Sequence, residues 1–127
     1  DAMTAKGYTK EELLEAGLLS QNRDKGTLYD RFRNRLMFPI IDVRGNVIGF
    51  GGRVMDDSTP KYLNSPETII FNKRRNLFAM NVVKKSKREF IILTEGYMDA
   101  IALRLCGGLA RHLADAGARG HAVQIYR

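Results

Sequence analysis

The stretch Phe90–Asp99 reads Phe-Ile-Ile-Leu-Thr-Glu-Gly-Tyr-Met-Asp and has the pattern of a strand that leads into a helix. Its continuous apolar start predicts a strand covered on both faces, as in a parallel sheet. Helical spacing of apolar residues follows from Tyr97 to Leu105. Glu95 thus ends the strand and Asp99 lies one turn into the helix, where α/β sheets bind ligands. Two such carboxylates suit a hard cation such as Mg²⁺; the alternative is a helix-start glutamate beside a solvated aspartate.

The composition indicates a single domain-sized globular chain. It has 127 residues, of which 44% are hydrophobic, enough for a core. One cysteine, Cys106, excludes a disulfide framework and a Cys-x-x-Cys zinc site. We therefore expect a reducing, cytoplasmic setting. No signal peptide or membrane span is visible, so no membrane partner is expected. Asp1 is an unusual natural start, and we interpret the chain as a piece of a longer protein.

Positive charge is concentrated in the middle of the chain. The formal net charge is +7, and residues 23–88 hold 15 Lys/Arg against 6 Asp/Glu, an excess of 15 − 6 = 9. A field of that sign attracts polyanions such as nucleic acid. The alternative is a generally basic surface without a partner.

The N-terminal region predicts one short helix. Thr9 followed by Glu12 is a capping-box signature, and Gly17 is a favourable stop. The polar residues 20–26 predict a loop. Further along, Asn76 is expected to cap a helix that runs to about Lys87.

The central region predicts an antiparallel hairpin. Alternation over Arg31–Arg35 would place three arginines on one face of an extended segment. An apolar strand over 36–41 follows, with Pro39 implying an edge or a bulge. Residues 42–46 predict a tight reversal. Val47–Val54 is the return strand, whose glycines indicate bulges or close backbone approach.

Arginines in a row with aromatic residues nearby suit a groove that follows the backbone of single-stranded nucleic acid. Contacts of this kind position a chain and do not read sequence. The basic side chains are far apart in the sequence and converge only if the sheet brings them together; they are Arg31, Arg33, Arg35, Arg53, Lys61 and Lys73.

Four stretches together resemble the bacterial replicative DNA primase. They read Arg-Phe-Arg-Asn-Arg-Leu-Met-Phe-Pro-Ile (31–40), Val-Ile-Gly-Phe-Gly-Gly-Arg-Val (47–54), Lys-Tyr-Leu-Asn-Ser-Pro-Glu-Thr (61–68) and Glu-Gly-Tyr-Met-Asp (95–99). The resemblance covers roughly residues 7–103 in unbroken order.

The resemblance implies an α+β fold and an RNA-primer-synthesising enzyme. Residues 1–88 would be the N-terminal subdomain of the catalytic core, with a mixed or antiparallel sheet, and 89–105 the first β-α unit of a topoisomerase–primase (toprim) subdomain. Glu95 and Asp99 would be the first acidic residues of its Mg²⁺ or Mn²⁺ site, with two-metal phosphoryl transfer as the mechanism. The cleft that holds template and nucleotides would include Arg31, Arg33, Arg53, Lys61, Tyr62, Asn64 and Lys73.

Such a primase copies single-stranded DNA with ribonucleoside triphosphates at the bacterial replication fork in the cytoplasm. It binds zinc through an N-terminal domain and the replicative helicase through a C-terminal domain, and we expect both domains to be absent here. The Asp-x-Asp pair of toprim is also missing, since Asp115 is the only acidic side chain after Asp99. The metal site is then incomplete, and we expect this chain alone to be inactive.

The tail after Leu103 departs from the family. Codons exist for residues 107–127 that, when read one nucleotide later, give a sequence that begins Ala-Val-Ser-Leu-Gly-Thr and ends Arg-Tyr-Thr. That sequence looks like the toprim segment that the family has at this point. We therefore expect 106–127 to be a divergent tail from a frameshifted reading, with little strand character and at most a loose helix over 109–116. The alternative, a zinc site of Cys106, His112 and His121, lacks a fourth ligand and standard spacing.

Two other functions remain open on the sequence. One is a non-catalytic module that binds single-stranded DNA. The other is a different toprim enzyme, a topoisomerase or a nuclease, against which the stretches at 31–40 and 61–68 argue because they lie outside toprim.

Overall fold

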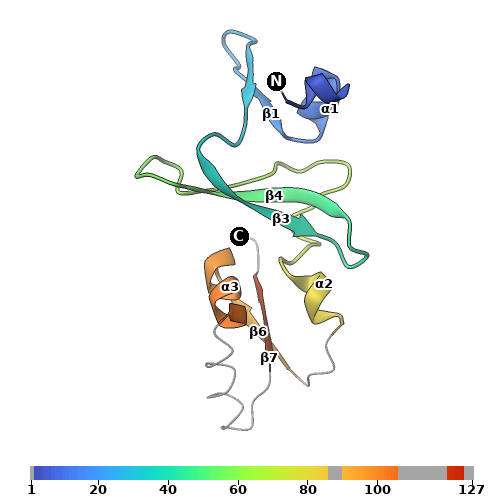
Figure 1. The fold of residues 1–127 in the computed structure, drawn as a ribbon, viewed down its shortest axis with the longest axis vertical. Helices are drawn as coiled ribbons and strands as arrows, with labels where there is room; N and C mark the ends of the chain where they lie inside the picture. The colour runs from blue at the N-terminus through green and yellow to red at the C-terminus, as the bar shows by residue number, and fades with distance from the viewer. Residues whose placement is uncertain (1, 86–89, 106–119, 125–127) are drawn as a thin grey trace. The chain divides into compact units, whose positions relative to one another are not determined.

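The computed structural model describes residues 2–85, 90–105 and 120–124, and the contacts divide the chain into two compact units. One unit comprises Asp1–Pro39 and Gly49–Asn72, and the other comprises Ile40–Ile48 and Lys73–Arg127. Helices occur beside antiparallel strands, which confirms the α+β class (Figure 1). The elements are η1 (Thr4–Lys6), α1 (Lys10–Glu15), β1 (Leu19–Gln21), β2 (Leu28–Asp30), β3 (Arg35–Ile41), β4 (Val47–Val54), β5 (Tyr62–Asn64), α2 (Met80–Val83), β6 (Phe90–Thr94), α3 (Tyr97–Leu105) and β7 (Gly120–Gln124).

Helix α1 forms as its capping signature predicts. The Thr9 hydroxyl accepts from the Glu12 N–H at 3.2 Å, and the Glu12 carboxylate accepts from the Thr9 N–H at 2.8 Å. Gly17, with φ +69°, turns the chain after the helix. The loop predicted over residues 20–26 is too long, because β1 and β2 pair as an antiparallel hairpin in which Ser20 faces Tyr29. Only the turn between these strands is the polar loop.

The strands β3, β4 and β5 form a three-stranded sheet in that order. Within this described sheet β3 lies at an edge, as its Pro39 indicates, since proline cannot donate to a ladder. The turn before β4 closes through the Asp42 N–H, which donates to the Asn46 carbonyl at 2.9 Å. The bounds of β4 agree with the predicted return strand.

Two glycines of β4 are sites of close approach. A Cβ on Gly49 would lie 3.2 Å from the Phe71 ring, and one on Gly52 would lie 3.0 Å from both Arg35 and Phe32. The predicted reason for these glycines is therefore confirmed. Phe71 is fully buried, so the glycine at 49 lets an aromatic side chain pack directly on the strand.

The predicted extended segment over Arg31–Arg35 is wrong. Residues 31–34 lie outside the strands, and β3 begins only at Arg35. Asn34 has φ +50°, a left-handed conformation that asparagine tolerates better than most residues. Its Nδ2 donates to the Asp56 carboxylate at 2.7 Å, and its carbonyl accepts from the Met55 N–H at 3.3 Å. The bend breaks the alternation, so the three arginines do not share a face.

In the second unit, β6 and α3 follow the predicted strand and helix. The strand β6 pairs in parallel with β7, so the parallel sheet is confirmed. The expectation that β6 is covered on both faces is wrong, because Ile91 and Leu93 are 47% and 57% exposed. The expectation of little strand character in the tail is also wrong, since β7 lies there. The predicted loose helix over 109–116 lies outside the described residues. So do Cys106 and His112 of the alternative zinc site, and the side chain of His121 is likewise outside the described part.

The predicted helix from Asn76 to Lys87 is wrong at its start. Helix α2 begins at Met80, and Ala79 before it has φ +67°, which interrupts any helix entering from Asn76. The Phe78 ring packs edge-on against Tyr97 with centroids 5.0 Å apart. The predicted end at Lys87 lies outside the described residues.

Candidate nucleic-acid interface and acidic site

The face of β4 and β5 that carries Arg53, Tyr62 and Asn64 is the best-defined basic and aromatic surface of the first unit. In the antiparallel register Arg53 is opposite Tyr62, and Asn64 is opposite Gly51. Side chains alternate along a strand, so positions 62 and 64 share one face with their partners. The Arg53 guanidinium carbon lies 6.0 Å from the centre of the Tyr62 ring, at the outer limit of a cation–π contact. We call Arg53, Tyr62 and Asn64 the β4–β5 face.

Arg33 forms a second pair of cation and ring. Its guanidinium carbon lies 5.0 Å from the centre of the Tyr29 ring, well within cation–π range. Arg33 is exposed and Tyr29 is 40% exposed. A charged group and a ring face are thus presented together to solvent.

Arg31 and Arg35 instead donate to the protein. The Arg31 Nε and Nη2 donate to the Asn64 carbonyl at 3.3 and 3.1 Å, and Nη1 donates to the Ser20 hydroxyl at 3.2 Å. Burial lowers the pKa of Arg31 from its ordinary value, partly offset by Tyr29; the group stays charged, as arginine does in proteins. The Arg35 Nη1 donates to the Pro60 carbonyl at 2.9 Å.

Two predicted basic residues lie outside these groups. Lys61 is exposed and comes directly before β5, where its carbonyl accepts from the Val54 N–H at 3.1 Å. Lys73 is half-buried in a turn of the second unit. The structure thus brings together Arg53, Tyr62 and Asn64. Lys73 belongs to the second unit, as do Glu95 and Asp99.

The two predicted acidic residues lie at the junction of β6 and α3. Glu95 follows the strand directly, Asp99 lies in the first turn of the helix, and both residues are exposed. A Cβ on Gly96 would lie 2.9 Å from the Asp99 Oδ2, so this carboxylate turns back toward the junction. The donor set fits a hard cation in kind, since both groups offer carboxylate oxygens. It is small, because within the described residues no three His, Cys, Asp or Glu side chains group as a metal site.

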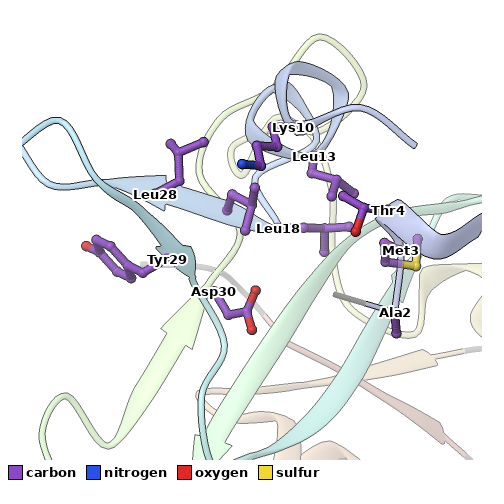
Figure 2. A pocket seen from close by; sticks show the side chains of 10 residues that line it. Ala2, Met3, Thr4, Lys10, Leu13, Leu18, Leu28, Tyr29 and Asp30 are labelled. Carbon is purple, nitrogen blue, oxygen red and sulfur yellow. The ribbon is translucent and has the colours of Figure 1, made fainter. Parts of the chain in front are cut away.

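A pocket of about 520 Å³ lies in the first unit, and none of the predicted site residues lines it (Figure 2). Figure 2 shows leucine side chains from α1 and the β1–β2 hairpin around it, with Lys10 and Asp30 as its charged members. Its lining consists of Ala2, Met3, Thr4, Lys10, Leu13, Leu18, Leu19, Leu28, Tyr29 and Asp30. Tyr29 is therefore shared between this pocket and the pair with Arg33.

Sequence reasoning missed Tyr29 and Ser20 as partners of the predicted arginines. Both partners lie in the β1–β2 hairpin, which was not predicted from the sequence. The turn signal at residues 22–26, flanked by Leu19 and Leu28, was the one clue to that hairpin. None of the helices in the described part of the chain has the length and apolarity to cross a bilayer.

Comparison with known proteins identifies the family. The family described as "DNA primase catalytic core, N-terminal domain" matches residues 1–84. A DNA primase of Clostridium acetobutylicum is 58% identical over 106 residues, which cover 83% of this chain and 17% of that protein. A DNA primase of Deinococcus radiodurans is 44% identical over 126 residues, covering 96% of this chain and 22% of the relative. Similarity to this relative thus continues beyond Leu103, where the sequence analysis expected it to stop.

The solved structures agree with the sequence relatives. A structure described as the DnaG primase catalytic domain bound to ssDNA matches with a TM-score of 0.75 at 43% identity, covering 100% of this chain and 39% of that one. The chain therefore spans about a fifth of the length of these curated relatives. It belongs to the DNA primase family, and residues 1–84 are the N-terminal domain of the primase catalytic core.

Proposed function

We propose that this chain holds single-stranded DNA for a bacterial primase, and that the complete polypeptide makes RNA primers on that template from ribonucleoside triphosphates. The observation that carries the proposal is the β4–β5 face, where a cation, a ring and an amide lie side by side on two paired strands. The solved relative bound to ssDNA supports it. The primer-synthesising activity belongs to the longer protein, because this chain spans only part of its relatives.

The chemistry of the basic side chains fits a backbone-tracking surface. Arg33, Arg53 and Lys61 would contact phosphates, while Tyr62 offers a ring on which a base can stack. The amide of Asn64 can donate to a phosphate or accept from a sugar hydroxyl. Such contacts fix the register of the strand without reading its sequence. Lys73, in the second unit, is proposed as a further contact to nucleic acid in the complete enzyme.

We propose that Glu95 and Asp99 would hold a divalent cation, Mg²⁺ or Mn²⁺, in the complete enzyme. Such an ion supplies charge stabilisation for phosphoryl transfer. In this chain the two carboxylates stand at the end of β6 without a third acidic neighbour among the described residues. We therefore expect no primer synthesis by these 127 residues, and DNA binding without catalysis is the second candidate function.

Helicase contact and zinc binding are proposed for the complete polypeptide, which would act at the replication fork in the bacterial cytoplasm. Neither is assigned to residues 1–127. A primer-synthesis assay with Mn²⁺ and labelled ribonucleotides separates the two candidate functions of this chain. Labelled product from the purified chain, abolished in Glu95→Gln, would overturn the expectation of inactivity.

The test of DNA binding is fluorescence anisotropy with a labelled oligothymidylate across a series of NaCl concentrations. Replacing both Arg33 and Arg53 by Ala should weaken binding. It should also lower the magnitude of the slope of log K against log[NaCl], the salt slope, by about 0.7 for each phosphate that is no longer neutralised. The matched control replaces Arg23 and Arg44, two exposed arginines of turns, and removes the same charge. Equal weakening in the two double variants, or a parent chain that does not bind, would refute the proposed surface.

A further inference from the structure

We infer that Arg31 is a positioning residue that holds strand β5 in place beneath the β4–β5 face, and that it does not contact phosphate itself. The inference rests on the proposed function and changes the role that the sequence predicted for this arginine.

All three guanidinium nitrogens of Arg31 donate to acceptors of the protein. Nε and Nη2 converge on the carbonyl of Asn64, the last residue of β5, and Nη1 reaches the hydroxyl of Ser20 in β1. These partners lie 33 and 11 residues away along the chain. Arg31 therefore joins the β1–β2 hairpin to the end of β5.

The Arg31 backbone is also anchored. Its N–H donates to the Leu18 carbonyl at 2.9 Å, so the residue is held on the segment between α1 and β1. Its side chain is half-buried, whereas Arg33 two residues later is exposed. An arginine fixed at both ends has to break hydrogen bonds before it can reach a phosphate.

The chain after Asn64 is held by two further contacts. Ser65, fully buried, exchanges bonds with Phe50 of β4: its N–H donates to the Phe50 carbonyl at 2.8 Å, and its hydroxyl accepts from the Phe50 N–H at 2.9 Å. Pro66 packs on Gly17, where an added Cβ would lie only 2.5 Å from Pro66 Cδ. We call the two bonds from Arg31 Nε and Nη2 to the Asn64 carbonyl the Arg31 fork. Together with the contacts of Ser65 and Pro66, the fork holds residues 64–66 in place, and we call this set of contacts the clamp.

This clamp sets the position of Tyr62 and Asn64. The strand β5 has three residues, so its register against β4 depends on few ladder bonds. Removing the fork frees the Asn64 carbonyl and lets the end of β5 shift relative to Arg53. Affinity for DNA then falls although every phosphate-binding side chain is still present.

The experiment measures oligothymidylate binding by anisotropy for the 127-residue parent, Arg31→Ala, Arg31→Lys and Arg33→Ala across NaCl concentrations. We expect Arg31→Ala to weaken binding about tenfold and to leave the salt slope unchanged. Arg33→Ala should lower the slope by about 0.7. Arg31→Lys should not restore affinity, because an ammonium cannot reproduce a planar fork that donates from three nitrogens.

The outcomes separate this inference from the proposed function. Arg31 would be a phosphate contact if Arg31→Ala lowered the slope as Arg33→Ala does, or if Arg31→Lys restored binding; the β4–β5 face would then still stand. A parent chain that does not bind DNA would overturn both proposals. Unchanged affinity in Arg31→Ala would overturn the positioning role alone.

A spectroscopic reporter distinguishes positioning from a general decrease in stability. The chain contains no tryptophan, so Tyr62→Trp introduces a single reporter on β5. In that background Arg31→Ala should shift the emission of the tryptophan under conditions where circular dichroism shows the chain folded. Arg44→Ala, at the exposed hairpin turn, is the control. Identical emission spectra with and without Arg31 would show that the fork does not position the strand.

Discussion

Gly17 shows how one residue constrains the packing of the first unit. Its φ of +69° lies in the left-handed region, and a Cβ there would meet Pro66 at 2.5 and 2.7 Å. Gly7 has a φ of +92° but nothing within 4 Å of an added Cβ. The two positions separate the cost of backbone strain from the cost of a steric clash.

We predict that Gly17→Ala lowers the free energy of unfolding by about 2–4 kcal/mol, since strain and overpacking add. Gly7→Ala should cost only the strain, about 1–2 kcal/mol. Urea denaturation followed by circular dichroism measures both. Equal destabilisation in the two variants would mean that Pro66 moves aside without cost.

At the scale of elements, the β3–β4 turn depends on one carboxylate. The Asp42 Oδ1 accepts from the N–H groups of Asn46 and Arg44 at 2.9 and 2.8 Å. These bonds, with that of Asn46 first, lower the pKa of Asp42 below its ordinary 3.8. A carboxylate with a lowered pKa stabilises the fold above its ordinary pKa, and the contribution disappears as pH falls through the lowered value.

We predict that Asp42→Asn destabilises the chain near neutral pH and that the difference from the parent shrinks at an acidic pH, as the Asp42 carboxylate becomes protonated below its ordinary pKa of 3.8. Urea midpoints measured at both pH values test this. Asp57→Asn, in the exposed turn after β4, controls for the removal of one negative charge. A difference that stays constant with pH would show that the Asp42 carboxylate does not support the turn through its charge.

The β6–α3 junction permits a direct test of the acidic site. An Ala at position 96 would meet only the Asp99 carboxylate, the end of a side chain that can move. We predict weak Mn²⁺ binding by the parent, with a Kd on the order of 10⁻³ M, that is weakened further by Gly96→Ala and abolished in Glu95→Gln with Asp99→Asn. Electron paramagnetic resonance of Mn²⁺ measures it, with Glu11→Gln and Asp24→Asn as the charge-matched control. Unchanged Mn²⁺ binding in both the double variant and its control would exclude a site at this junction.

At the scale of the whole molecule, we propose that 89–105 begins a toprim subdomain and that 106–127 comes from a shifted reading frame. The described part of the tail holds β7, which pairs in parallel with β6. A toprim reading would supply a strand from the sequence Ala-Val-Ser-Leu-Gly-Thr instead.

The nucleotide sequence from the codon for Leu103 onward decides between the two readings. We predict that a one-base shift restores the toprim strand and, further downstream, an Asp-x-Asp pair. If no shifted frame encodes the toprim strand and the Asp-x-Asp pair, the tail is the natural sequence of this chain. DNA binding without catalysis would then be the leading function of this chain.

Local signals in the sequence determined the elements whose hydrogen bonds close within a few residues. The capping box at Thr9 and Glu12, the reversal at Asp42–Asn46, and the strand and helix around Glu95 all formed as predicted. The family was also evident from contiguous motifs. In each case the interacting groups are neighbours in the chain, so composition and spacing are sufficient.

The tertiary structure alone decided where the arginines point. Arg31 and Arg33 alternate in sequence, yet one is held by Asn64 and the other lies over Tyr29. Residues 31–34 lie outside the strands, so strand alternation does not apply to them, and the left-handed bend at Asn34 is stabilised by a partner 22 residues away. Ala79 interrupts the predicted helix in a similar way, beside a ring that packs on Tyr97. Contacts of this kind join residues distant in the chain, and their free energy overrides local periodicity.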